Sequence, residues 1–389
     1  MNPALSTTGS GGDGQPPPAP DGDGAAGQPP TIYDVARVAG LSIASVSRVL
    51  NGQRNPRQET RERVLRAVAE LGFVPDGAAR ALSARLKEVV GVVVRRPRWT
   101  DGSMFTDEDE NLQFPDMINR GMEIVAQQHG FDLLIRSVGL DELDAGQRIF
   151  ALARKSDGLI LHDRILSPEE LDRLSRQIPV VTLAGVPTPT TVNVHGDNEG
   201  GMRALARHLI FDHGYRTFSY LAGHEGSPDS LTRGQALADE VAAAGAQLLT
   251  GEQWRGGYQA AGGSQAIGRL LAAGVAMPRA IVCANDQSAI GVLYALAQHG
   301  IAVPGEVAVT GFDDMPVARH LRPQLTSVRQ SIQDLGVTAF ETVYSMIGRG
   351  PDADDGTRGR DIALPTHLVL RRSCGCGSQP APVSIEGAE

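Results

Sequence analysis

Apolar residues along this chain recur with two different spacings, and each spacing predicts a different kind of element. Between Thr31 and Leu71 they follow the spacing of short amphipathic helices. From Glu88 onward, short apolar runs such as VVGVVV, GLILH and VAVTGF alternate with helical stretches. The helical stretches are expected near 114–129, 143–154, 198–213, 230–244, 257–273 and 286–299. Buried strands that alternate with helices predict parallel sheets covered on both faces, so we expect a small helical unit followed by an α/β body.

The helical unit has the pattern of two helices joined by a tight turn. Thr31 is a favourable N-cap for the first helix, and Gly40 is a natural C-terminal stop. Ser42 can cap a second helix after a connection as short as that of a helix-turn-helix. A third helix is expected at about 58–71, ended by Gly72. Its apolar residues are Val64, Leu65, Val68 and Leu71.

The second helix would present two different faces. One face is an apolar stripe, and the other holds small or hydrogen-bonding residues with one guanidinium. The stripe consists of Val46, Val49 and Leu50, and the opposite face consists of Ala44, Ser47, Arg48 and Asn51. Arginine can read guanine in a major groove, where small apolar groups can touch thymine methyls. A solvated amphipathic helix is the alternative, but the paired helix and the tight turn favour a DNA-reading helix.

The segment from Thr31 to Gly91 resembles the headpiece of the LacI/GalR family of bacterial transcription regulators. It carries the phrases DVARVAGLS, VSRVLNG, TRERVLRAVAELGFVP and ARALSARLKEVVGVVV in the family's order and spacing. The resemblance implies that Arg48 reads a base, and that exchanging Ile43 and Ala44 changes the preferred operator. It also implies that Thr31, Tyr33 and Thr60 contact the DNA backbone and thereby position the headpiece on the DNA. The DNA-binding residues expected in total are Thr31, Tyr33, Ser42, Ile43, Ala44, Ser45, Ser47, Arg48, Asn51, Thr60, Ala79 and Leu82.

Two segments flank the headpiece at 31–75. Residues 1–30 are rich in Gly, Pro and Asp, so we expect a disordered tail. Residues 76–88 are expected to be a linker, whose Ala-rich part at 76–84 is too short for a stable lone helix. In the resembled family this is the hinge helix, which pairs with its two-fold mate and pushes a leucine, here Leu82, into the minor groove. Asp76 departs from the asparagine often found there, and its charge would repel phosphates.

Charge is distributed unevenly along the chain. The formal net charge is −9, yet residues 31–90 contain ten Arg and Lys against six Asp and Glu, a net of +4. Because residues 1–30 carry three Asp, the rest of the chain carries −10. A basic module joined to an acidic body fits DNA binding by one part only.

The three cysteines, Cys283, Cys374 and Cys376, are too few for a disulfide framework and fit a reducing cytoplasm. Cys374-Gly-Cys376 resembles a metal or redox motif, but we identify no second Cys or His pair at ligand spacing and interpret these residues as free thiols. The chain shows no signal peptide, no membrane-spanning run, and no G-x-S-x-G, H-E-x-x-H or Walker loop. We therefore predict a cytoplasmic protein with no membrane association, catalytic residue, bound metal or cofactor.

The body at 89–372 is expected to form two α/β lobes, because it is longer than one doubly wound sheet usually needs. The resemblance implies the same architecture, a periplasmic-binding-protein-like effector domain. LPTHLVLR is expected to be its last strand. The predicted boundaries are 89–188 plus 329–348 for lobe 1, 190–327 plus 350–372 for lobe 2, and 373–389 for a loose C-terminal tail.

Polar residues that follow the apolar runs are the candidate ligand contacts, because doubly wound sheets bind ligands at the carboxyl ends of strands. These residues are His195, Asp197, Asn198, Asn285, Asp286, Asp313 and Asp314. Side chains that donate and accept in a plane suit a polyhydroxy ligand. Helix capping is the alternative for each, and at least as good for Asp197, Asn198 and Asp314. Trp254 and Tyr258 are equally consistent with ligand stacking and with core packing. The pattern of the resembled family implies effector contacts by Phe114, Arg203, Asn285, Asp286, Asp313 and Gln330.

Together these features predict a homodimeric, sequence-specific DNA-binding transcription regulator, a repressor whose two-lobed body binds a small effector. The expected partners are palindromic double-stranded operator DNA, a sugar or sugar derivative, and a second copy of the chain, with a tetramer as the alternative assembly. An activator or a partner-regulated protein is the alternative within the family. A sugar-binding protein would have no use for the headpiece, and an enzyme would need catalytic motifs.

Overall fold

A computed structural model of the chain describes residues 29–50, 56–74, 86–96, 113–139, 144–162, 165–348 and 356–377. The chain divides into two compact units between Ser83 and Ala84. Most of the predicted N-terminal tail, Asn51, and the hinge segment with Ala79 and Leu82 lie outside the described residues.

The described part of the first unit is a bundle of α1 (Ile32–Ala39), α2 (Ile43–Leu50) and α3 (Gln58–Leu71). Residues from all three helices share one small core, which consists of Val35, Ala36, Ala39, Val46, Val64, Ala67 and Phe73. Leu65, which the apolar pattern grouped with Val64, is 50% exposed, so α3 buries Val64 and Ala67 instead. The predicted helix-turn-helix with a supporting third helix is confirmed.

Local signals fix the ends of these helices. Gly40 and Gly72 have φ of 61° and 60°, a left-handed conformation that glycine adopts without steric cost. At the start of α1 the Asp34 carboxylate accepts hydrogen bonds from the backbone nitrogen of Thr31 (3.0 Å) and from its hydroxyl (2.7 Å). These bonds, with one from Arg37, lower the pKa of Asp34 to about 2. Asp34 therefore stabilises the helix start as an anion.

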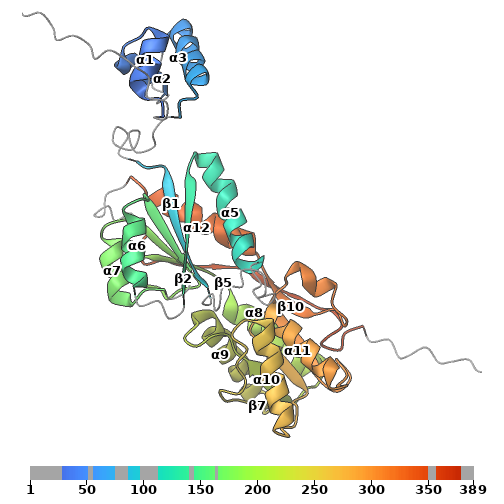
Figure 1. The fold of residues 1–389 in the computed structure, drawn as a ribbon. Coiled ribbons are helices and arrows are strands. Elements are labelled where there is room, and N and C mark those ends of the chain that lie inside the picture. The colour runs from blue at the N-terminus through green and yellow to red at the C-terminus, as the bar shows by residue number, and fades with distance from the viewer. Residues whose placement is uncertain are drawn as a thin grey trace, which may run out of the picture. The chain divides into compact units, whose positions relative to one another are not determined.

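The described part of the second unit contains two six-stranded sheets, one per lobe, with strand orders β11-β5-β4-β3-β1-β2 and β12-β10-β9-β8-β6-β7 (Figure 1). The first sheet comprises β1 (Val89–Arg96), β2 (Asp132–Gly139), β3 (Gly158–His162), β4 (Val180–Leu183), β5 (Val192–Gly196) and β11 (Asp361–Leu364). The second comprises β6 (Thr217–Leu221), β7 (Gln247–Leu249), β8 (Ala280–Cys283), β9 (Ala308–Asp313), β10 (Thr326–Gln330) and β12 (Thr366–Val369). Among these strands every pairing is parallel except that of β10 with β12. The predicted body of two parallel α/β lobes is confirmed.

Helices cover both faces of each sheet. The first lobe has α5 (Gln113–His129), α6 (Ala145–Ala153), α7 (Pro168–Ser175) and α12 (Ile332–Met346). The second lobe has α8 (Asn198–Arg207), continued by a π-helical turn at His208–Asp212, α9 (Pro228–Ala243), α10 (Ala260–Ala272) and α11 (Asp286–Gln298). The predicted helical stretches match six of these helices, whereas α7 and α12 were not expected.

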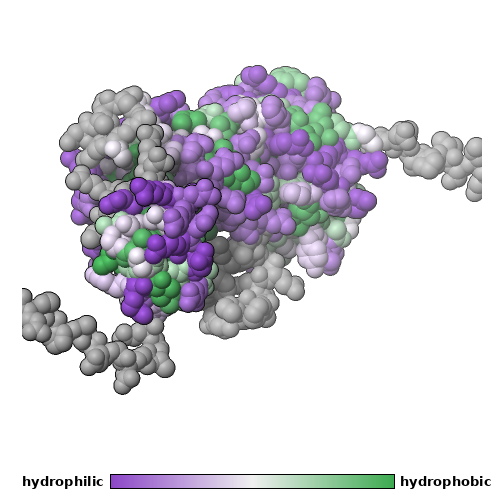
Figure 2. Space-filling model, turned by 90° about the horizontal axis from the view of Figure 1, so that it is seen from above, coloured by the Kyte–Doolittle hydropathy of each residue, from purple (hydrophilic) through white to green (hydrophobic). Residues whose placement is uncertain are grey.

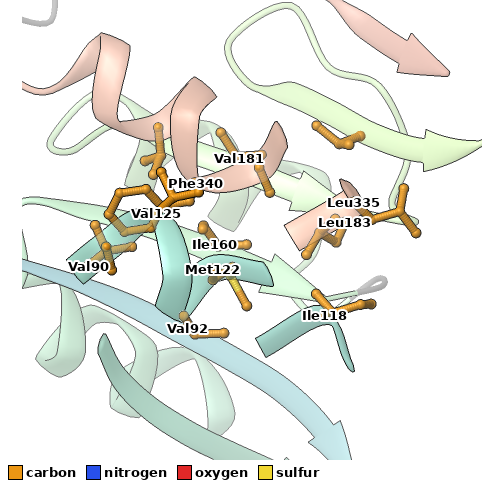
Figure 3. Packing of buried hydrophobic residues seen from close by; sticks show 14 of the residues in the cluster. Val90, Val92, Ile118, Met122, Val125, Ile160, Val181, Leu183, Leu335 and Phe340 are labelled. Atoms are coloured by element: carbon orange, nitrogen blue, oxygen red, sulfur yellow. The ribbon is translucent and has the colours of Figure 1, made fainter. Parts of the chain in front are cut away.

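The core of lobe 1 shows how alternate strand residues meet the covering helices. Val90 and Val92 of β1 pack with Met122 of α5 and Phe340 of α12 (Figure 3). Val93, which points to the opposite face of the sheet, packs in a separate cluster with α6 and α7. Lobe 2 has two corresponding clusters, so both sheets are buried on both faces, as their continuous apolar runs predicted.

Three described segments pass between the lobes and lie close together. They connect β5 to α8, β10 to α12, and β11 to β12. The Asp197 nitrogen donates to the Leu364 carbonyl (2.7 Å), and the Thr366 hydroxyl donates to the Asp197 carbonyl (3.1 Å). The predicted single last strand in lobe 2 is therefore wrong, since β11 belongs to the first sheet and β12 to the second. Pro365 lies between them and lacks the N–H that a continuous paired strand would use.

The expected loose C-terminal tail is also wrong for its first residues. Ser373 and Cys374 are fully buried. The Ser373 nitrogen donates to the Gln324 carbonyl (2.9 Å), and its carbonyl accepts from the Val309 nitrogen (3.0 Å). The Tyr215 hydroxyl donates to the Cys374 carbonyl (2.7 Å). Residues 373–377 are thus part of lobe 2.

One face of the molecule is seen in Figure 2. On the face seen in Figure 2, hydrophilic residues predominate and apolar residues occur in small separate groups. None of the described helices is both long enough and apolar enough to span a membrane.

Candidate functional site

The outer face of α2 is the candidate DNA-reading surface. Val46 is fully buried on the inner face, whereas Ala44 and Arg48 are exposed and Ile43 is 42% exposed. The Ser42 hydroxyl accepts from the Ser45 nitrogen (3.2 Å), so Ser42 caps α2 as predicted. The helix therefore combines an apolar inner stripe with an outer face that carries a guanidinium and small side chains.

The remaining described residues of the predicted DNA-binding set belong to all three helices of the bundle. Thr31 and Tyr33 are at the start of α1, and Tyr33 is 68% exposed. Thr60 is in the first turn of α3, where it is half-buried. Ser45 and Ser47 are also half-buried on α2. Their contacts with DNA stay predictions.

Arg63 of α3 supports the turn, a role that sequence reasoning missed. Its guanidinium donates to the Ala39 carbonyl through two nitrogens (3.1 and 2.7 Å) and to the Gly40 carbonyl (3.2 Å). The planar fork of N–H groups allows one side chain to bond both carbonyls at the end of α1. Arg63 therefore ties α3 to the turn that sets the direction of α2.

The candidate ligand site of the body is built around Asp313 and Arg233, at the carboxyl ends of the lobe 2 strands. Asp313 ends β9 and is 5% exposed, and Arg233 of α9 is 2% exposed. Arg233 Nη1 lies 4.0 Å from Asp313 Oδ1, and its guanidinium carbon lies 3.7 Å from the centre of the Phe312 ring. Gln330, at the end of β10, donates to Asp313 Oδ1 (2.6 Å). A buried ion pair therefore lies beside a segment that crosses to lobe 1.

Arg233 is held in place by three further groups. Its Nε donates to Asn198 Oδ1 (2.7 Å), its Nη1 to the Ala284 carbonyl (2.7 Å), and its Nη2 to Asp229 Oδ2 (3.4 Å). Asn198 in turn donates to Asp229 Oδ1 (2.8 Å). The network joins α8, α9 and the end of β8, so the guanidinium is fixed before any ligand binds.

Burial controls the electrostatics of Asp313. It raises the pKa of Asp313 to about 7, although the Arg233 charge and the hydrogen bond from Gln330 both act to lower it. Asp313 also has φ of 111°, an unfavourable backbone conformation for a residue with a Cβ. A strained, buried carboxyl with a shifted pKa beside a fixed cation is typical of a functional site.

Two other predicted ligand contacts are Asn285 in lobe 2 and Phe114 in lobe 1. Asn285 follows β8 and is half-buried, and its amide donates to the Tyr258 carbonyl (3.2 Å). Its oxygen accepts from the Ser288 nitrogen (2.9 Å), so it also caps α11. Phe114, at the start of α5, packs half-buried against the lobe 1 core that also contains Met315. The contacts of Asn285 and Phe114 with a ligand stay predictions.

Asp286 supports the loop that follows Asp313 and the neighbouring strand β10. It is 0% exposed. Its Oδ2 accepts from the Met315 nitrogen (2.7 Å) and its Oδ1 from the Ser327 hydroxyl (2.5 Å). One oxygen thus holds the loop that follows Asp313 and the other holds β10, and contact of Asp286 with an effector stays a prediction.

The structure does not bring Arg203 to Asp313. Its guanidinium pairs with Glu199 (2.8 Å), Glu240 (3.0 Å) and Asp239 (3.3 Å). Arg203 lies five residues after the inward-facing Asn198. That separation corresponds to about 140° around a helix, so the two side chains point in different directions. Arg233, one helical turn after Asp229, is the cation that lies beside Asp313, and the sequence analysis did not name it.

The helix-capping alternative holds for Asp197 but not for Asp314. Asp197 caps α8 by accepting from the Gly200 nitrogen (2.9 Å). Asp314 is not a cap but pairs with Arg329 (2.7 Å) and Arg371 (2.6 Å). Trp254 is 2% exposed inside a lobe 2 core cluster, which confirms its interpretation as core packing.

Lobe 1 also contains a hollow of about 380 Å³ at the ends of β3 and β4. Its described lining is mainly apolar, and Asp172 is the one charged residue among the described residues that line it. It shares no residue with the Asp313 cluster. We therefore place the candidate ligand site at the cluster, where convergent polar groups are found.

One further group of side chains could hold a metal ion. His208, His213, Cys374 and Cys376 bring four ligand atoms within 4.8 Å of one another. The sequence-based statement that no His pair accompanies the two cysteines is wrong, because His208 and His213 are that pair. The signal was present as His-x₄-His, a spacing found in zinc sites, but more than 150 residues separate it from the cysteines.

A helix-turn-helix bundle on the same chain as a two-lobed α/β body with a buried polar cluster defines a class of protein, the transcription regulators with a ligand-binding body. Residues 31–76 match the family described as bacterial regulatory proteins, lacI family, and residues 206–374 match the periplasmic binding protein-like domain. The chain belongs to the lacI family of bacterial regulatory proteins. It is a sequence-specific DNA-binding transcriptional regulator.

Relatives and solved structures agree with this assignment. The chain is 33% identical over 316 residues to the HTH-type transcriptional regulator GalS of Salmonella typhimurium, covering 80% of this chain and 88% of that protein. It is 30% identical over 351 residues to the HTH-type transcriptional repressor PurR of Vibrio parahaemolyticus, covering 88% and 98%. The lac repressor dimer bound to operator and the anti-inducer ONPF superposes with a TM-score of 0.74 at 25% identity, covering 89% of this chain and 99% of that one. The complex of the regulator CelR with cellobiose has a TM-score of 0.60 at 29% identity, covering 88% and 99%.

Proposed function

We propose that this regulator is a homodimeric repressor that leaves its operator when a small polyhydroxy effector, a sugar or sugar derivative, binds in the body. The observation that carries the proposal is the buried ion pair of Asp313 and Arg233 at the carboxyl ends of the lobe 2 strands. Burying two charges is costly unless other groups compensate them. Buried charged pairs are therefore found in sites whose function needs fixed polar groups.

The chemistry of the cluster suits sugar hydroxyls. A hydroxyl donates one hydrogen bond and accepts others, so it can bridge a carboxylate acceptor and a guanidinium or amide donor. Asp313 supplies the acceptor, Arg233 the cation, and Asn285 and Gln330 the amides. The cellobiose complex of CelR and the lac repressor bound to ONPG support this ligand class.

The route from this site to DNA would use the loop after Asp313 and the crossing at Gln330. The Gln330 amide donates a hydrogen bond to Asp313. Met315, which lies two residues after Asp313, is buried in the lobe 1 core. A ligand that binds the two lobe arrangements unequally would shift their populations. The hinge segment at 77–84, outside the described residues, would pair with its copy in the dimer and form helices at the minor groove in one arrangement only. The coupling needed is about 1–3 kcal/mol.

The test begins with selection of operator DNA from a random pool by the full chain. Fluorescence anisotropy then measures the release of that DNA by a panel of monosaccharides and disaccharides. One sugar class should release wild-type protein, whereas Asp313→Asn and Arg233→Lys should bind the operator normally and fail to respond. Arg203→Ala, outside the cluster, is the matched control and should respond like wild type.

Two results would contradict the proposal. Normal sugar response in both Asp313→Asn and Arg233→Lys would place the effector elsewhere. Absence of release by any sugar would favour a partner-regulated repressor. We also infer binding without turnover, so the releasing sugar should be recovered unchanged after incubation with the protein. A promoter reporter with one operator separates a repressor from an activator.

A further inference from the structure

The four side chains of His208, His213, Cys374 and Cys376 form a compact donor set at the end of lobe 2. The Nε2 atoms of the two histidines are 3.0 Å apart. Cys376 Sγ lies 3.5 Å from each of these nitrogens. Cys374 Sγ lies 3.6 Å from His208 Nε2. All four donor atoms therefore face one common point.

These distances match the edges of a tetrahedron around a zinc ion. Zn–S bonds of about 2.3 Å and Zn–N bonds of about 2.05 Å give S···N edges of about 3.6 Å and an N···N edge of about 3.3 Å. The three observed S···N distances are 3.5–3.6 Å, and the N···N distance of 3.0 Å would have to open slightly. We propose that this cluster is a structural zinc site with two cysteine and two histidine ligands.

A second layer of contacts orients the ligands. Asp212 Oδ2 lies 2.7 Å from His208 Nδ1, so the hydrogen is on Nδ1 and the Nε2 lone pair is directed at the cluster. A carboxylate that accepts from the far nitrogen of a histidine is the usual support of a metal ligand. The Thr326 hydroxyl donates to Cys374 Sγ (3.0 Å), which favours the thiolate that a metal requires.

The backbone is also shaped for this arrangement. Residues His208–Asp212 form a π-helical turn, closed by a hydrogen bond from the His213 nitrogen to the His208 carbonyl (3.3 Å). In such a turn residues i and i+5 lie one turn apart on the same side, so both imidazoles face the cysteines. Between the cysteines, Gly375 has φ of 110°, and a Cβ there would lie 2.9 Å from the Tyr215 hydroxyl. The Cys-Gly-Cys turn thus needs its glycine.

Charge and position indicate a structural role. Zn²⁺ with two thiolates and two neutral imidazoles has no net charge, which suits ligands of which His208 and Cys374 are buried. The two thiol protons leave to solvent when the metal binds. The site follows the last residue of α8, whereas Asn198 of the Asp313 cluster is its first residue, roughly 15 Å away along the helix. Zinc would fasten residues 372–377 to lobe 2 without touching the proposed effector site.

The test uses the full chain, purified without a histidine tag or chelator. Elemental analysis should find about one zinc per chain, the stoichiometry of a single closed site. Cobalt(II) added to metal-free protein should give the absorption bands of a tetrahedral thiolate site. Cys376→Ser should lose the zinc and the thiolate–cobalt band, whereas Cys283→Ala, at a buried cysteine of another cluster, should keep both.

A surface variant guards against misfolding of the ligand variants. Asp212 is largely exposed, and Asp212→Asn should weaken zinc binding about 10–100-fold in a chelator competition, as loss of such support usually does. Asp172→Asn, at a helix surface in lobe 1, should leave zinc affinity unchanged. Metal-free protein that takes up neither zinc nor cobalt while its thiols are reduced would overturn the proposal. A disulfide between Cys374 and Cys376 in protein purified under reducing conditions, or equal zinc affinity in all variants, would do the same.

Discussion

The variant Asp313→Asn tests whether the buried Asp313 carboxyl keeps its proton up to about pH 7 in the folded chain. Because burial raises its pKa to about 7, Asp313 keeps its proton in the folded chain at pH values where the unfolded chain has lost it. Between the ordinary value of 3.8 and about 7 the folded state therefore binds one proton more than the unfolded state. The free energy of unfolding must then fall as the pH rises through this range.

The size of the effect follows from linkage. The slope is at most about 1.4 kcal/mol per pH unit, which accumulates to about 2–4 kcal/mol across the range once relaxation of the site is allowed for. Asparagine has nearly the same shape and does not titrate. Wild type should therefore lose stability relative to Asp313→Asn from pH 4 to 7, and the difference should become constant above that. Because Asp313 helps to raise the pKa of Asp286, the difference reports the titration of the two carboxyls together.

Urea unfolding at a series of pH values measures this difference. Trp254 is buried in lobe 2 and reports on the lobe that contains Asp313, and Trp99→Phe removes the other tryptophan. Asp172→Asn, the acid of α7 paired with Arg176 at 2.7 Å, is the control for carboxylate removal at the surface. A difference between Asp313→Asn and wild type that does not change with pH would refute the argument that Asp313 keeps its proton in the folded state up to about pH 7.

Three further predictions concern base reading by Arg48, the role of Arg203 and the hinge segment at 77–84. Arg48→Ala should relax preference at one base position of each half-site by about 1–3 kcal/mol in binding assays with operator variants, and uniform weakening of all sequences would contradict base reading. Arg203→Ala should keep the sugar response of wild type in the anisotropy assay, since Arg203 pairs with Glu199 and Glu240 and not with the ligand cluster. Residues 77–84 should show no amide-exchange protection without DNA, and strong protection in the free protein would exclude this hinge. Leu82→Ala should reduce operator bending and operator affinity while the headpiece stays folded.

The sequence predicted elements wherever one local pattern decided the structure. The N-cap at Thr31 and the stop at Gly40 bounded α1, and the continuous apolar runs located the buried strands. The sequence did not predict contacts that depend on how segments far apart in the chain pack together. Arg203 and Arg233 both lie on helices rich in small residues, and only the packing of α8 against α9 determines which guanidinium points at Asp313.

The end of the chain illustrates the same limit. LPTHLVLR has the composition of one strand, but Pro365 divides it and its halves join different sheets. The sequence analysis found no ligand partners for Cys374 and Cys376 because the matching histidines lie far upstream, at the start of the π-helical turn His208–Asp212 and directly after it. Their meeting depends on Ser373 pairing with Val309 at the start of β9, an interaction that no local pattern encodes.

The last prediction concerns Gln330, which is placed to connect the ligand site with the lobe crossing. Its amide donates to Asp313 (2.6 Å), and its oxygen lies where a Cβ on Gly196 would come within 2.5 Å, so it is packed between two crossing segments. Gln330→Met keeps the length of the side chain and removes the hydrogen bond. If Gln330 transmits ligand occupancy, effector affinity should fall only modestly, whereas the factor by which effector weakens operator binding should fall by several fold.

Thermodynamic reciprocity provides an internal control for this variant. Operator DNA must change effector affinity by the same factor by which effector changes operator affinity. Calorimetry of the effector with and without operator should therefore show the same reduced factor in Gln330→Met as the anisotropy assay does. Loss of effector binding with an unchanged coupling factor would show that Gln330 only contacts the ligand, and the connection between site and crossing would then lie in the loop from Asp313 to Met315.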